Sequence, residues 1–154
     1  MYPILLAVHS VIRWLVLISL LYALYRAYRG WYTKALFTIY DIRARQIIAT
    51  IAHIQLVVGI WLYLISPIVS YFRQHLKTAI HIREIRFFGM EHSTMMLLAI
   101  ILITIGSGKA KRETTAIKKF KTMAIWFSIA LLIIFASIPW AFSPLVSRPN
   151  FRPF

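Results

Sequence analysis

Long apolar segments alternate with short basic ones along the chain. Four mainly apolar segments cover residues 2–25, 46–66, 87–106 and 123–142, and each is close to the ~20 residues that a helix needs to cross a bilayer. The fourth contains no charged residue or histidine, and we expect Pro139 to bend its far end. The pattern predicts an all-α integral membrane protein, with one four-helix up-and-down bundle over residues 1–154.

The first apolar segment is expected to stay in the protein as a true span. It has no basic start, its apolar stretch is too long for a cleaved signal peptide, and Arg13 lies inside it.

The segment 67–85, between the second and third spans, is too polar to cross a membrane. Apolar side chains recur there at helical spacing opposite basic ones: Phe72, Leu76, Ala79 and Ile80 against Arg73, Lys77 and Arg83. This pattern predicts a short amphipathic helix on the outer membrane surface. The tail after Ser143 holds three prolines, and we expect it to be extended and packed near the outer face.

Composition narrows the class of protein. Hydrophobic residues make up 60% of the chain and charged residues 14%, whereas soluble domains have about 25% charged residues, so an ordinary soluble enzyme is excluded. The net charge is +14, but the basic residues lie between apolar runs, so membrane topology explains them better than nucleic-acid binding. The chain has no cysteine, which excludes disulfides, iron–sulfur clusters and covalently attached haem.

The distribution of lysine and arginine predicts the orientation. The loops after the first and third spans lie on one side and hold 11 cations: Arg26, Arg29, Lys34, Arg43, Arg45, Lys109, Lys111, Arg112, Lys118, Lys119 and Lys121. The opposite side holds six: Arg73, Lys77, Arg83, Arg86, Arg148 and Arg152. Positive loops stay in the cytoplasm, so we expect a multi-pass bacterial inner-membrane protein with both termini outside the cytoplasm.

Ionisable groups inside spans are costly and are therefore the candidate functional residues. They are His9, Arg13, His53, Glu91 and His92. With span centres near residues 14, 56 and 96, His9 and His92 lie about 7 and 6 Å from the midplane at ~1.5 Å per residue, both in the outer half. The second span runs the other way, which places His53 on the order of 12 Å from their level.

Matched depth favours His9 and His92 as a pair. The first and third helices of such a bundle are parallel and diagonal across the core, so two imidazoles at one depth can ligate a haem b from both sides. Space near them is expected from Ser10, Gly89, Ser93 and Ala99, and cations for the haem propionates from Arg13, Arg86, Arg148 and Arg152.

Arg13 follows His9 by four residues, so both side chains lie on one helical face. We favour a haem propionate as its anionic partner, which leaves Glu91 to orient a neighbouring donor. Two alternatives are an ion pair with Glu91 and snorkelling to the outer headgroups.

His53 has no second histidine at its level, so we expect it to hydrogen-bond across helices, with Gln55 as a neighbour. A second haem in the inner half would instead make His53 a ligand.

Two other functions remain open. The histidines could serve only interhelical hydrogen bonds in a structural or assembly subunit of a larger inner-membrane complex. Met90, Met95 and Met96 surround His92 and would suit Cu(I) in a copper-handling protein. No carboxylate pair, Ser-His-Asp set or phosphate-binding glycine loop is present in the sequence, so hydrolase and kinase functions have no support.

Several motifs together resemble a family. They are H-S-x-x-R-W (from His9), H-x-Q-L-x-x-G-x-x-L-Y (from His53) with a following S-P, R-F-F-x-x-E-H-x-x-M-M (from Arg86), I-L-I-T-I-G (from Ile101) and S-I-P-W (from Ser137). Across nearly the whole chain they resemble small bacterial four-span cytochrome-b-like membrane proteins.

This resemblance implies haem binding and electron transfer, with His9, His53 and His92 as candidate ligands. An electron-transfer haem protein is then expected rather than a stand-alone enzyme. Besides the lipid bilayer, its partners would be other respiratory or membrane-complex subunits, or a quinone.

Overall fold

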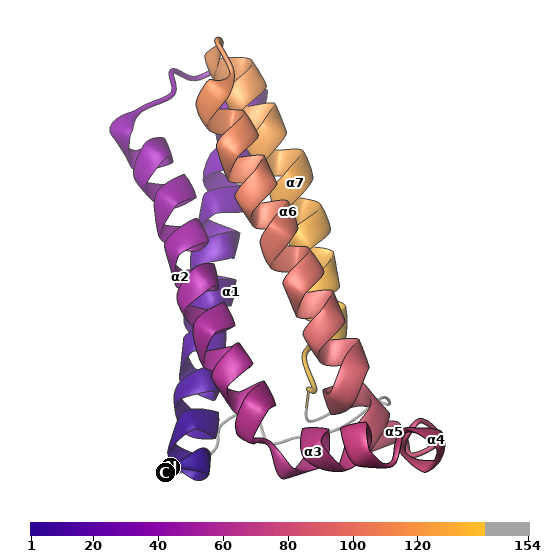
Figure 1. The fold of residues 1–154 in the computed structure, drawn as a ribbon. Helices are drawn as coiled ribbons and strands as arrows, with labels where there is room; N and C mark the ends of the chain where they lie inside the picture. Colours follow the sequence, from indigo (N-terminus) through magenta and orange to yellow (C-terminus); the bar gives the residue numbers. More distant parts are fainter. Residues whose placement is uncertain (141–154) are drawn as a thin grey trace.

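Four long helices dominate the computed structural model, which describes residues 1–140 (Figure 1). They are α1 (Tyr2–Tyr32), α2 (Ile39–Ile65), α6 (His92–Arg112) and α7 (Ala116–Ser137). With the short helices that precede α6, the third span is a 30-residue helical segment, Arg83–Arg112. All four are long and apolar enough to cross a membrane, so the all-α fold is confirmed and the chain is a multi-pass membrane protein whose helices face lipid.

The helices form two hairpins that pack side by side. α1 packs on α2 and α6 on α7, and the hairpins meet where α1 contacts α7 and α2 contacts α6. Helices α1 and α6 are therefore diagonal. Figure 1 shows both basic connections, α1–α2 and α6–α7, at one end of the bundle, with the N-terminus and the link between α2 and α6 at the other.

That link differs from the single amphipathic helix predicted over 67–85. It consists of α3 (Pro67–Gln74), α4 (Leu76–Ala79) and α5 (Arg83–Arg86). The backbone leaves the helical region at His75 (φ −125°, ψ 43°) and again at Ile82 (φ −92°, ψ 107°), which divides the segment. Of the four apolar side chains named for that helix, Phe72 and Ala79 are buried in the protein, whereas Leu76 and Ile80 are exposed on its surface.

Several helix ends also differ from the predicted spans. α1 and α6 continue past 25 and 106, because hydropathy reports only the part of a helix that lies in hydrocarbon. α7 ends at Ser137 instead of 142 because Ile138, which precedes Pro139, is extended (φ −77°, ψ 130°). Pro139 thus follows a helix end instead of bending a helix. The predicted extended tail falls within 141–154, outside the described residues.

Small residues bring the helices together, as is usual in membrane bundles. Fully buried alanines lie in all four long helices: Ala23, Ala27, Ala44, Ala52, Ala99, Ala110, Ala124 and Ala130. At Gly106 a Cβ atom would lie 2.4 Å from Cβ of Trp126, so glycine is what allows α6 to approach α7. Close packing thus fixes the rotation of each helix about its axis, and this rotation sets where the polar side chains inside the bundle point.

Polar contacts hold the basic end. Asp41 is buried, accepts hydrogen bonds from the backbone and hydroxyl of Thr38 at the start of α2, and pairs with Arg26 of α1 at 2.8 Å. Arg45 is also buried and donates to the carbonyl and hydroxyl oxygens of Ser107 on α6. These contacts tie α2 to both of its neighbours at this end.

Candidate functional site

His9 and His92 lie next to each other across the bundle diagonal. Their ring centroids are 6.4 Å apart and the ring planes cross at 71°. Each ring is partly buried, one on α1 and the other at the start of α6. The structure therefore brings together the two histidines that matched depth had paired.

The protonation of the His92 ring follows from its partner. Nδ1 lies 2.8 Å from the carbonyl oxygen of Ser137, the last residue of α7. A carbonyl oxygen only accepts, so Nδ1 carries the proton and the lone pair of a neutral ring lies on Nε2. Metal-ligating histidines are commonly fixed in this way by a backbone carbonyl.

Helix α2 forms the wall behind His9. The side-chain amide of Gln55 donates to the His9 carbonyl oxygen at 3.0 Å. Gly59 faces the ring itself, since a Cβ atom added there would lie 3.5 Å from Cε1 of His9. Within the described residues, Nδ1 of His9 and Oε1 of Gln55 are buried without a hydrogen-bond partner. These two atoms leave hydrogen-bonding capacity on this wall.

A π-helical segment, η1 (Phe87–Glu91), leads directly into His92. Tyr63 of α2 donates from its hydroxyl to the Gly89 carbonyl oxygen at 2.9 Å. Gly89 is buried against Phe72 of α3, whose ring would lie 2.4 Å from an added Cβ atom. Both α2 and α3 thus hold the segment that carries His92.

The two histidines open into one cavity of about 580 Å³. Its lining comes mainly from α1, α2 and α6, with contributions from α3 and the end of α7, and is largely apolar. The polar side chains in the lining are Tyr2, His9, Ser10, Arg13, Gln55, Tyr63, Ser66, His92 and Ser93. Ser10 and Ser93 supply the space predicted for them, whereas Gly89 and Ala99 lie outside the lining. Ligand pockets are commonly of this size and character.

Arg13 lies in the cavity lining, one turn from His9. Its Nη2 is 3.4 Å from the hydroxyl of Ser10, and its guanidinium carbon lies 5.5 Å from the centroid of the Trp14 ring. A fixed positive charge therefore borders the same space as the two imidazoles.

Arg86 and Glu91 are placed differently from the expectation. They form an ion pair with each other at 2.6 Å, each about one-third exposed, and neither lines the cavity. Arg86 also donates to the Ile80 carbonyl oxygen. The structure assigns Glu91 to Arg86, and the pair joins α5 to the end of the π-segment. The other two predicted propionate partners, Arg148 and Arg152, lie outside the described residues.

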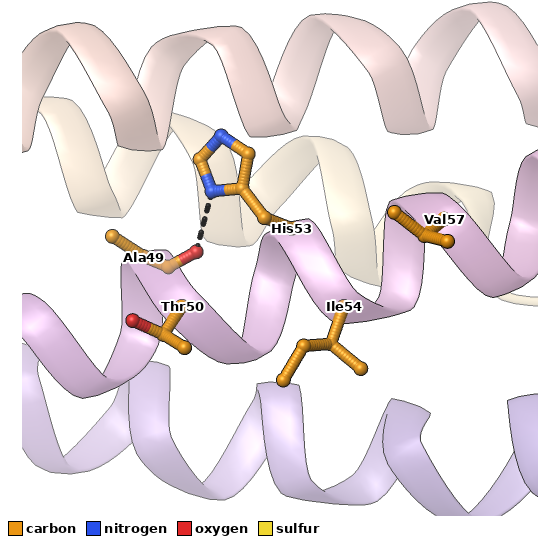
Figure 2. Close-up of a pocket in the computed structure, with 5 residues that line it drawn as sticks. All are labelled: Ala49, Thr50, His53, Ile54 and Val57. Atoms are coloured by element: carbon orange, nitrogen blue, oxygen red, sulfur yellow. Dashed lines mark hydrogen bonds between the residues drawn. The ribbon is translucent and has the colours of Figure 1, made fainter.

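His53 is separate from the pair and exposed on the bundle surface. Figure 2 shows its ring extending from α2, with Nδ1 2.6 Å from the carbonyl oxygen of Ala49. Its Nε2 lies 3.4 Å from the hydroxyl of Thr104 on α6, which is the interhelical bond expected of it. Gln55 contacts His9 instead of His53.

The remaining candidate ligands do not gather around the site. Met96 lines the cavity, whereas Met90 is exposed, and so are His75 and His81. Over residues 1–140 no group of three or more histidine, cysteine or acidic side chains could hold a metal ion. The pair of His9 and His92 has only two members, so this finding does not bear on it.

Sequence reasoning missed the support that α2 gives to both histidines. Gln55, Gly59 and Tyr63 are spaced four residues apart and so lie along one helical face. All three occur in the H-x-Q-L-x-x-G-x-x-L-Y motif, whose spacing was the available signal. The role of Ser137 left no side-chain signal, because its backbone carbonyl makes the contact.

Comparison with protein-family models, with curated proteins and with solved structures finds no match to this chain. The family resemblance of the motifs therefore stays an expectation, and the function has to be argued from the site.

Proposed function

We propose that the chain is a membrane b-type cytochrome, or a cytochrome-like subunit, that binds haem b between His9 on α1 and His92 on α6 for electron transfer. The observation that carries this proposal is the pair of imidazoles, 6.4 Å apart, at the edge of a single cavity. No other pair of histidines in the described part of the chain has its rings in contact.

The separation of the rings and their shared cavity would allow His9 and His92 to hold one haem together. The tautomer of His92 also suits ligation, since its Nδ1 proton is held by Ser137 and Nε2 keeps its lone pair.

The cavity supports the proposal through its size and charge. A volume of about 580 Å³ with a largely apolar lining can exclude water from a large flat cofactor. Arg13 would face a propionate, because a guanidinium matches a carboxylate with two parallel hydrogen bonds. Haem bound there would carry single electrons, and the protein would orient the haem and tune its electrostatic surroundings.

A structural or assembly subunit is the second candidate, and two contacts favour it. His92 bonds to α7 through Ser137, and His53 bonds to α6 through Thr104. Interhelical hydrogen bonds of this kind are common in membrane bundles without any cofactor. The cavity and the unpartnered Nδ1 of His9 are what this candidate does not explain.

The deciding experiment is a reduced-minus-oxidised spectrum of the purified full chain, with haem and metal analysis. Sharp low-spin haem bands are expected in the wild type, and they should be lost or severely weakened in His9→Ala and His92→Ala. His75→Ala and His81→Ala are the controls, because both side chains are exposed on the α2–α6 link. An unchanged spectrum in either cavity variant would overturn the ligand pair. Bound copper instead of haem would support copper handling, and neither would support the structural subunit.

The proposal extends to location and partners. The excess of lysine and arginine at the end that holds the α1–α2 and α6–α7 connections supports a bacterial inner-membrane protein with both termini outside the cytoplasm. The haem would then lie in the outer half of the membrane. Its electrons would be exchanged with other membrane-complex subunits or with a quinone.

A further inference from the structure

The turn that delivers His92 into the cavity is not an ordinary α-helical turn. Phe87–Glu91 is a π-helix, and the backbone N–H of His92 bonds to the Phe87 carbonyl, five residues back. A π-turn holds one more residue than an α-turn, and such turns are frequent at functional sites. Removing the extra residue would rotate everything before or after it by about 100°. The π-segment therefore sets the direction of His92 relative to α3 and α5.

Tyr63, on α2, holds the π-segment from a neighbouring helix. Its partly buried hydroxyl donates to the Gly89 carbonyl oxygen at 2.9 Å, within the π-segment and three residues before His92. A π-turn interrupts the regular i→i−4 ladder, and a side-chain donor can stabilise the irregular backbone there. Tyr63 also lines the cavity. Its bond therefore joins the α2 wall to the helix that carries the opposite ligand.

A second contact explains why the position that Tyr63 grips is a glycine. The ring of Phe72 occupies the space that a Cβ atom at position 89 would need. Without a side chain, the backbone of residue 89 can lie between the phenyl ring on one side and the tyrosine hydroxyl on the other. The π-segment is thus clamped by α2 and α3 together.

We infer that Tyr63 is a positioning residue for His92: its hydroxyl stabilises the π-segment and thereby directs the His92 ring toward His9. The inference rests on the proposed function, because it names a residue that orients one of the two haem ligands. Tyr63 acts through the backbone and not on the haem. Its counterpart for His9 is Gln55, which holds the His9 carbonyl from the same face of α2.

The test compares Tyr63→Phe with Tyr28→Phe in the full chain. Tyr28 makes a 2.8 Å hydrogen bond to Ser128 between α1 and α7, far along the chain from both histidines, so its variant removes an interhelical tyrosine bond of similar length. Two quantities are measured: the side-chain ¹⁵N resonances of His92 in the haem-free protein, and haem affinity by titration. Circular dichroism and thermal unfolding report whether each variant is folded.

Tyr63→Phe is expected to shift the His92 resonances and to weaken haem binding about 10-fold or more, as loss of a ligand-orienting partner usually does. Tyr28→Phe is expected to change neither quantity. A folded Tyr63→Phe protein with wild-type His92 resonances would overturn the inference, even if its thermal stability fell.

Two further outcomes keep the inference separate from the proposed function. Absence of haem binding by the wild type would overturn the proposed function, while the resonances of the haem-free protein would still decide the role of Tyr63. If Tyr63→Phe did not fold, Tyr63→Met would be measured, because a flexible methionine fills the same space without a hydrogen-bond donor. A shift of His92 is expected in Tyr63→Met, which lacks the donor to the Gly89 carbonyl oxygen, and unchanged resonances would overturn the inference.

Discussion

His92 and Ser137 are joined by a 2.8 Å hydrogen bond between the start of α6 and the end of α7. The acceptor is the carbonyl of the last helical residue, which the helix itself no longer uses because the chain turns extended at Ile138. A helix end thus fixes the tautomer of an imidazole on the neighbouring helix. The position at which α7 stops is therefore part of the site.

Replacing Pro139 tests that relationship. Pro139→Ala removes the steric restriction on Ile138, so α7 can continue and engage the Ser137 carbonyl within its own helix. Haem affinity is expected to fall about 10-fold through loss of the partner of His92. Titration of the detergent-solubilised protein measures it. Pro3→Ala is the control, because a proline in the first turn of α1 occupies a position where its missing N–H costs nothing. Equal affinity in both variants would contradict the role of the helix end.

Arg13 is expected to tune the haem. Arg13→Leu removes a positive charge from the cavity lining, and loss of a cation favours the oxidised haem. The free energy of reduction should change by on the order of 1 kcal/mol, which lowers the midpoint potential by roughly 40 mV for a one-electron couple. Redox titration measures this shift. Arg29→Leu, at the opposite end of α1, is the control, since Arg29 is exposed in the last turn. Full haem occupancy with an unaltered potential in Arg13→Leu would remove Arg13 from the site and favour snorkelling.

His53 is expected to have no part in haem binding. His53→Leu should keep one haem per chain, because the ring bonds to Ala49 and Thr104 and lies on the bundle surface. Loss of the interhelical bond should cost about 0.6 kcal/mol of stability, the average for such bonds in membrane proteins. Haem-to-protein stoichiometry and detergent-induced unfolding check the two statements. Two haems per wild-type chain would instead make His53 a ligand.

Two glycines of α6 should respond differently to the same substitution. Gly106→Ala places a Cβ atom 2.4 Å from Cβ of Trp126, so α6 and α7 must separate. Overpacking of this kind costs about 1–3 kcal/mol. Gly108→Ala meets only the flexible end of Arg112, at 3.9 Å, and alanine favours the helix, so its stability should stay equal or rise slightly. Unfolding midpoints compare the pair, and equal losses would contradict the close approach at Gly106.

The orientation can be read with a reporter that is active only in the cytoplasm. Fused after Phe154, it should be silent, because the 11-to-6 distribution of lysine and arginine keeps the α1–α2 and α6–α7 connections inside. The same reporter inserted at Thr114, between α6 and α7, should be active. A bright C-terminal fusion would reverse the orientation and move the proposed haem to the cytoplasmic side.

Hydropathy predicted the four spans because burial in lipid needs only a long apolar run. It did not predict where α7 stops, since that depends on the backbone of Ile138 beside Pro139. Depth alone paired His9 with His92, because rise per residue is the same in every α-helix.

The sequence did not predict how each helix is rotated about its own axis, and this rotation decides which side chains meet. The grip of Gln55 on His9 and of Tyr63 on Gly89 depends on the packing angles of three helices. The ion pair of Arg86 with Glu91 spans the π-segment, and hydrophobic periodicity does not predict a π-segment.

The arrangement of the helices also sets the order in which the parts of the site come together during folding. The hairpin of α1 and α2 contributes His9, Gln55 and Tyr63, and the hairpin of α6 and α7 contributes His92 and Ser137. Each hairpin joins neighbours in sequence, so both can form early from local contacts. The two imidazoles meet only when one hairpin docks on the other. Proximity of His9 to His92 is therefore a marker of completed assembly, and a spectroscopic probe of that pair would time the last step of folding.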